Sequence, residues 1–62
     1  MLLNDIVQRL NGKSIYYMEK IGDNKYLFCD DNIYFVITYS DYLKRYETNL
    51  SYVDKWLRIW QN

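Results

Sequence analysis

The sequence predicts an α+β fold in the order α-β-β-β-α-α, with a small three-stranded antiparallel sheet packed against helices. Three observations predict it. Apolar residues near the N-terminus recur at helical spacing, the middle of the chain alternates β-forming runs with short polar turns, and the last third returns to helical spacing. A chain of 62 residues is long enough for one domain at most. We therefore expect residues 1–62 to form a single domain.

The first element is an amphipathic helix over residues 2–10. Polar side chains occupy the side of the helix opposite to its apolar arc. Asn11 and Gly12 follow, and glycine readily adopts the left-handed conformation that closes a helix, so we expect the helix to end there. The apolar arc consists of Leu2, Leu3, Ile6, Val7 and Leu10.

Three strands follow the helix. Residues 14–21 and 25–29 are rich in β-forming side chains, and the turn residues 22–24 between them predict an antiparallel hairpin. Residues 30–32 are short and polar, as is typical of a second turn. Residues 33–39 carry the strongest strand pattern in the chain. The simplest arrangement is a three-stranded meander.

Two further helices are expected at the C-terminal end. Ser40 is a favourable N-cap and Asp41 suits a first helical turn, so together they predict a second helix, which breaks near residues 48–49. Ser51 then precedes a third helix over residues 52–61. The alternative joins both into one long kinked helix. The apolar side of the second helix would carry Tyr39, Tyr42, Leu43, Tyr46 and Leu50.

The third helix has more apolar surface than a small core needs. Its apolar arc spans about 180°, against roughly 100° for an ordinary surface helix. One side can cover the sheet, and the other needs a second cover. Either the first helix lies against that other side, or it faces a second chain, since tryptophan and tyrosine often anchor interfaces. The candidate interface residues on this helix are Tyr52, Trp56, Ile59 and Trp60.

The strand over residues 33–39 is apolar on both faces. Such strands are usually central and covered on both sides, yet in a three-stranded meander this one would be an edge. An exposed, apolar, proline-free edge is a template for association. Tyr34 and Val36, on one face of the strand, therefore join the candidate interface residues. We expect a homodimer formed through this strand or through the last helix.

Catalytic chemistry has few residues to use. The chain has no histidine, one cysteine and two glycines, which excludes an internal disulfide, a histidine-bearing zinc site, a Ser-His-Asp triad and a phosphate-binding glycine loop. Asp30 and Asp31 are expected to form a solvated turn rather than a cation site. Cys29 is expected to be a buried, inert thiol. The sequence therefore predicts no enzyme, no cofactor and no metal site.

Nucleic acid is a second candidate partner. Eight basic and eight acidic residues give no net charge, which argues against non-specific nucleic-acid binding. Sheet aromatics such as Tyr17, Tyr26 and Phe35 resemble a stacking platform for a single strand, and this is the alternative function. A basic helix face is a third candidate, suited to a charged protein but equally typical of a solvated surface. It would consist of Lys44, Arg45, Lys55 and Arg58.

No membrane segment or targeting signal is expected. Polar residues interrupt the N-terminus at once, so a signal-peptide core is missing. The longest apolar run, residues 33–37, is far shorter than the ~20 residues of a membrane span. The sequence predicts a cytoplasmic protein.

The composition resembles that of small proteins encoded by bacterial viruses and other mobile elements of AT-rich genomes. The chain is very short, rich in Tyr, Asn, Ile, Lys and Asp, and lacks catalytic residues. Many proteins of that kind bind and block a host enzyme or a defence complex. The resemblance implies a non-enzymatic inhibitor or modulator that occludes a larger host protein, in the host cytoplasm if the chain is viral.

Overall fold

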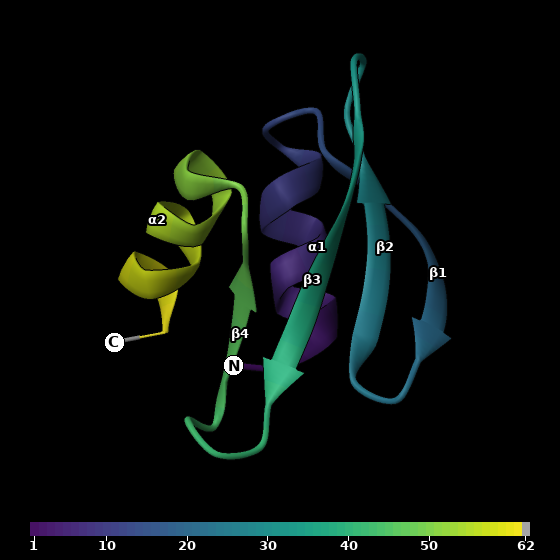
Figure 1. The fold of residues 1–62 in the computed structure, drawn as a ribbon. Coiled ribbons are helices and arrows are strands. Elements are labelled where there is room, and N and C mark those ends of the chain that lie inside the picture. The colour runs from purple at the N-terminus through teal and green to yellow at the C-terminus, as the bar shows by residue number, and fades with distance from the viewer. Residues whose placement is uncertain (62) are drawn as a thin grey trace.

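The computed structural model describes residues 1–61 and confirms the α+β class, with two helices and one four-stranded antiparallel sheet in the order β1-β2-β3-β4. In Figure 1, α1 lies behind β3, between β4 and β2 in this view, and α2 stands alongside β4. Neither helix has the length and apolarity to cross a membrane. The elements are α1 (Leu3–Asn11), β1 (Tyr16–Gly22), β2 (Lys25–Cys29), β3 (Tyr34–Ser40), β4 (Arg45–Thr48) and α2 (Ser51–Trp60).

Helix α1 lies where the sequence predicts it, but it closes differently. Gly12 has a φ of −63°, in the right-handed region, so the expected left-handed closure at this glycine is wrong. The left-handed residue is Ser14, with a φ of 62°. The N–H of Ile15 then donates to the carbonyl of Leu10 at 3.0 Å, a bond typical of helix C-termini. This closure turns Ile15 into the core, where it is 2% exposed.

The predicted second helix is wrong: residues 41–44 form a turn, and β4 follows. Ser40 caps this turn, because its Oγ accepts the N–H of Leu43 at 3.1 Å and its carbonyl accepts the N–H of Lys44 at 2.7 Å. Lys44 has a φ of 58°, which a helix does not allow. A serine that can cap a helix can equally cap a turn. Pairing with β3 decides between the two.

Because β4 pairs with β3, β3 lies between β2 and β4 and is not an edge strand. The prediction of three strands with β3 exposed along its side is therefore wrong. Its two faces are as expected. Phe35 and Ile37 point to the core, and Tyr34 and Val36 point to the opposite face of the sheet. The edge strands are β1 and β4.

Helix α2 closes the outer edge of β4. The side chain of Gln61 accepts the N–H of Tyr46 at 2.8 Å and donates to its carbonyl at 3.1 Å. Asp54 accepts the N–H of Thr48 at 3.4 Å. At the other edge, every residue of β1 is exposed, and its pairing with β2 is interrupted by two register shifts. Thus one edge of the sheet is capped by side chains and the other is irregular.

The core lies between the sheet and the helices. Phe28 of β2 is completely buried and stacks on Phe35 with a centroid distance of 6.0 Å. Burial, with the neighbouring Tyr26 and Tyr39, raises the pKa of Tyr46, the innermost tyrosine. No charged or polar side chain is buried in residues 1–61. The buried residues are Ile6, Leu10, Ile15, Phe28, Phe35, Ile37, Tyr46, Val53 and Leu57.

Candidate protein interface

Three aromatic side chains form a row along one side of α2. Tyr52, Trp56 and Trp60 follow one another at a spacing of four residues, which places them on one face of a helix. The rings of Tyr52 and Trp56 meet edge to face at 5.6 Å, and those of Trp56 and Trp60 stack at 6.3 Å. Each ring therefore supports the next. Ile59 lies beside this row, and we call these four residues the α2 surface.

Helix α1 supplies part of the cover that this side of α2 needs. The guanidinium of Arg9 stands 5.5 Å from the centre of the Trp60 ring, and the ammonium of Lys13, just beyond α1, stands 4.6 Å from that of Trp56. Both distances suit cation–π attraction. Both indoles are half-buried and pack against the core. The tryptophans thus join the helices and keep part of their surface open to solvent.

The most exposed side chains of the α2 surface are those of Ile59 and Tyr52. Ile59 is 61% exposed and Tyr52 is 43% exposed. Tyr52 is held in place, because its hydroxyl donates to Oδ2 of Asp30 at 3.0 Å. This bond ties α2 to the turn between β2 and β3. Desolvation, followed by the hydrogen bond to Asp30 and its negative charge, raises the pKa of Tyr52.

Asp30 organises the turn between β2 and β3. Its Oδ1 accepts the N–H groups of Asn32 and Ile33, both at 2.8 Å. Those bonds, from Ile33 first and Asn32 next, lower the pKa of Asp30 below its ordinary value of 3.8. The acidic residues after β2 thus form a hydrogen-bonded turn. Among residues 1–61, no three side chains of the metal-ligating types come together.

The lowered pKa of Asp30 predicts a specific loss of stability in acid. The carboxylate stabilises the fold above pH 3.8, and this contribution is lost as the pH falls through the lower pKa of the folded state. Asp30→Asn keeps an acceptor oxygen but removes the titration. We expect urea unfolding, followed from neutral pH to about pH 2, to show a shallower acid dependence in this variant than in the wild type. Asp31→Asn, which removes the neighbouring carboxylate and leaves the Asp30 hydrogen bonds in place, is the matched control.

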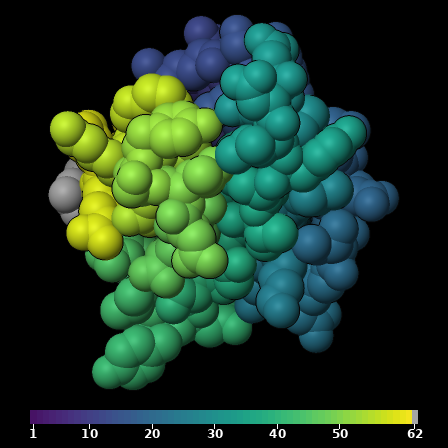
Figure 2. All heavy atoms as spheres, turned by 45° about the horizontal axis from the view of Figure 1, so that its top comes forward, coloured from purple at the N-terminus to yellow at the C-terminus, as the bar shows by residue number. Residues whose placement is uncertain are grey.

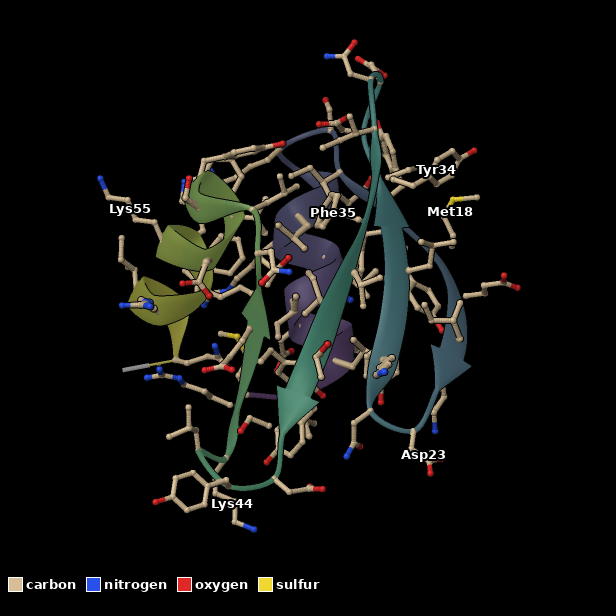
Figure 3. All side chains as sticks on the ribbon, in the orientation of Figure 1. Met18, Asp23, Tyr34, Phe35, Lys44 and Lys55 are labelled. Atoms are coloured by element: carbon tan, nitrogen blue, oxygen red, sulfur yellow. The ribbon has the colours of Figure 1, made fainter. Side chains whose placement is uncertain are left out.

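A second exposed surface lies on the face of the sheet opposite the helices. The open-face patch, as we name it, draws side chains from three neighbouring strands. Tyr16, Cys29 and Tyr34 are in register across β1, β2 and β3. The Sγ of Cys29 lies 3.4 Å from the Sδ of Met18, and Figure 3 shows Met18 and Tyr34 projecting on the same side of the sheet. The patch consists of Tyr16, Met18, Ile21, Leu27, Cys29, Tyr34 and Val36.

The structure divides the six candidate interface residues between these two surfaces. Tyr34 and Val36 belong to the open-face patch, and the other four form the α2 surface. Tyr34 is 69% exposed, while Val36 is half-buried. Val36 lines a hollow with Ile21, and its margin carries charged side chains of β2, β4 and α2, namely Lys25, Glu47, Asp54 and Arg58. The two groups come from different elements and face different directions, so each can make a contact of its own.

The aromatics expected to stack nucleic acid do not share one exposed face. Phe35 is 8% exposed and points toward the helices. Tyr26 also packs against the core, with its ring 6.2 Å from that of Tyr46. Tyr17, which is 37% exposed, rests its ring edge on Phe28 at 5.4 Å. These rings hold the sheet to the helix layer.

The basic side chains expected on one helix face lie on separate elements. Lys44 and Arg45 belong to the β3–β4 turn and to β4, whereas Lys55 and Arg58 belong to α2. The Arg45 guanidinium pairs with Glu47 at 3.4 Å. The Arg58 guanidinium pairs with Asp54 at 2.8 Å. The four side chains therefore do not form the single basic helix face that the sequence suggested.

The sequence predicts Tyr42 and Leu43 on a helix, but both lie exposed in a turn. Tyr42 is 92% exposed and Leu43 is 46% exposed, at the tip of the β3–β4 turn. This turn projects from the molecule in Figure 2. Asp41 anchors it, because its Oδ2 accepts from the side-chain amide of Asn24 at 2.9 Å. The sequence signal for β4, and hence for this turn, is the alternation of the charged Arg45 and Glu47 with the inward Tyr46.

The α2 surface carries aromatic side chains that neighbouring elements contact and hold. Lys13 and Arg9 stand over the tryptophans of α2, and Asp30 holds Tyr52. Such surfaces are suited to bind protein, since aromatic anchors in rigid settings contribute most to interfaces. Comparison with protein families, with curated proteins and with solved structures finds no match to this chain.

Proposed function

We propose that this chain is a non-enzymatic protein-binding protein, an inhibitor or modulator that occludes a larger protein in the cytoplasm, or in the host cytoplasm if the chain is viral. The α2 surface makes the contact. The observation that carries the proposal is the row of Tyr52, Trp56 and Trp60, whose rings support one another while Ile59 beside them is 61% exposed.

Fixed side chains favour binding because little conformational entropy is lost when a partner covers them. Arg9 and Lys13 restrain the indoles from one side, and Asp30 restrains the phenol of Tyr52. The contact would therefore use side chains already in their bound positions. An interface of this kind combines a central apolar and aromatic patch with a polar rim. Lys55 and Arg58, on the polar side of α2, would belong to that rim.

Occlusion requires no chemistry from the inhibitor. A rigid domain of 31 × 25 × 20 Å is large enough to cover a substrate entrance or a subunit contact on a larger protein. The absence of net charge means that the contact would depend on apolar complementarity more than on long-range attraction. Binding should accordingly depend weakly on salt.

The test is quantitative capture of a partner from the source cell, or from its host. Tagged wild-type protein is compared with Ile59→Lys, which changes the α2 surface, and with Ile21→Lys, which makes the same change on β1. These two isoleucines are 61% and 47% exposed, and β1 is the edge of the sheet opposite to β4, the strand that α2 contacts. We expect a specific partner with the wild type and with Ile21→Lys, and at least tenfold less of it with Ile59→Lys.

Two results would count against the proposal. Recovery of no protein other than the chain itself would contradict binding to a larger partner. Equal capture by all three proteins would show that the partner does not contact α2. If a partner is captured as expected, titrations of the purified partner with the wild type and the two variants should give the same order of affinities at low and at moderate salt.

A further inference from the structure

The open-face patch is not covered by any element in residues 1–61. An antiparallel sheet with one solvent-facing side usually carries polar side chains there. Here that side bears seven apolar, aromatic or sulfur-containing side chains from β1, β2 and β3, of which Tyr34, Met18 and Ile21 are 69%, 48% and 47% exposed. A contiguous apolar patch of this kind marks a contact surface in a small protein.

Neither edge of the sheet is suited to accept another strand. On β4, the backbone groups of Tyr46 are taken by Gln61, and the N–H of Thr48 is taken by Asp54. On β1, the register shifts twice, and Glu19 and Lys20 lie in the middle of the strand. Bulges and charges at an edge oppose strand addition. Association through this sheet is therefore expected to use its open face.

We propose that a second copy of this chain covers the open-face patch, so that two sheets pack face to face in a twofold-symmetric dimer. Two sheets can stack about 10 Å apart when apolar side chains fill the space between them. A twofold axis lets one patch cover its own copy on both chains. This inference goes beyond the proposed function, because it assigns a different surface to a different partner.

The size of the molecule limits how large this contact can be. The molecule measures 31 × 25 × 20 Å, so its broadest face covers at most about 775 Å². A standard interface takes about 800 Å² from each partner. A sheet-on-sheet dimer would thus use the whole open face, with the apolar patch toward β1 and the polar residues toward β4.

The charges on the face also permit self-association. Glu19 and Glu47 are acidic, and Lys25 and Arg45 are basic, so the open face carries no net charge. Two copies therefore meet without net repulsion. A target of strong positive or negative charge would find no matching excess on this face. The balance favours a copy of the same surface over a highly charged partner.

The oligomeric state of the purified protein tests the proposal directly. Light scattering and sedimentation equilibrium should show a species of twice the 7.7 kDa chain mass as concentration rises, with a Tm that also rises with concentration. Tyr34→Lys and Ile21→Lys should raise the dimer dissociation constant about tenfold or more. Tyr42→Lys and Ile59→Lys are matched changes at exposed sites outside the patch and should leave it unchanged.

Cys29 gives a second readout on the unaltered protein. It lies within the patch and is half-buried, so covering of the patch by a second copy should slow the reaction of its thiol with a maleimide reagent as the protein concentration rises. Cys29→Ser should show no such reaction. This measurement does not depend on whether a lysine variant folds.

The outcomes separate this inference from the proposed function. A 7.7 kDa species at all concentrations, with a constant Tm, would overturn the dimer. A dimer weakened by Ile59→Lys but not by Ile21→Lys would place the contact on α2 and overturn the proposed location, as would a Cys29 thiol that reacts equally fast in the monomer and in the dimer. Capture of the larger target is tested separately by Ile59→Lys on the α2 surface, and none of the results on the dimer changes that test.

Discussion

Replacing Phe28 by alanine is expected to lower the free energy of unfolding by about 3–5 kcal/mol. Phe28 is 0% exposed and lies at the centre of the sheet's inner face, where its ring meets those of Tyr17 at 5.4 Å and Phe35 at 6.0 Å. Truncation of a buried phenylalanine costs about 3–5 kcal/mol. A domain of this length has a free energy of unfolding of roughly 3–9 kcal/mol at the usual stability per residue. The substitution removes a large share of it.

Urea unfolding followed by circular dichroism measures the loss, at one protein concentration for all variants because association adds to apparent stability. Tyr42→Ala is the matched control, since it also removes an aromatic ring but from a site that is 92% exposed. We expect a change within about 0.5 kcal/mol there. A loss below about 1 kcal/mol for Phe28→Ala would contradict the packing described for the core.

Local signals predicted α1, the first hairpin, β3 and α2 because each is encoded in a few neighbouring residues. Helical spacing of apolar side chains placed α1 and α2, and the inward Val53 and Leu57 are fully buried as that spacing requires. The turn after β1 and the polar residues after β2 placed the hairpin and β3. In these segments the periodicity and the turn chemistry agree, so the sequence alone was sufficient.

The segment after β3 could not be assigned in this way, because its local signals are compatible both with the start of a helix and with a turn. Ser40 and Asp41 suit a helix start, yet Ser40 caps a turn and Lys44 takes the left-handed conformation that lets the chain reverse. The deciding interactions are distant in sequence. Arg45–Thr48 pairs with β3, and α2 covers the outer edge of that pair. No window of neighbouring residues contains these contacts.

The sequence suggested candidate interface residues but could not give their arrangement. The surplus of apolar side chains on α2 and on β3 was visible in the sequence. The contacts of Arg9 and Lys13 with the tryptophans depend on how α1 packs beside α2, and the open-face patch depends on the register of β1 against β2. Both are tertiary features. The roles of Gln61 and Tyr42 follow from β4 and were missed with it.

Replacing Gln61 by methionine is expected to lower the free energy of unfolding by about 1–3 kcal/mol, the usual cost of leaving a buried polar group without its partner. The Gln61 side chain makes three hydrogen bonds: it accepts from the Tyr46 N–H, and it donates to the carbonyls of Tyr46 and, at 3.0 Å, Leu57. Methionine keeps much of the side-chain volume and none of these bonds. The Tyr46 residue is 8% exposed, so water replaces them poorly.

Amide hydrogen exchange separates this role from simple packing. If Gln61 holds the edge of β4, the Tyr46 N–H should exchange at least about tenfold faster in Gln61→Met, and neighbouring β4 amides should follow as the strand opens locally. Gln8→Met makes the same change on an exposed site of α1 and should alter neither stability nor exchange in β4. Unchanged protection of Tyr46 in Gln61→Met would mean that pairing with β3 alone keeps β4 in place, and that the outer edge of the sheet is less firmly closed than the hydrogen bonds indicate.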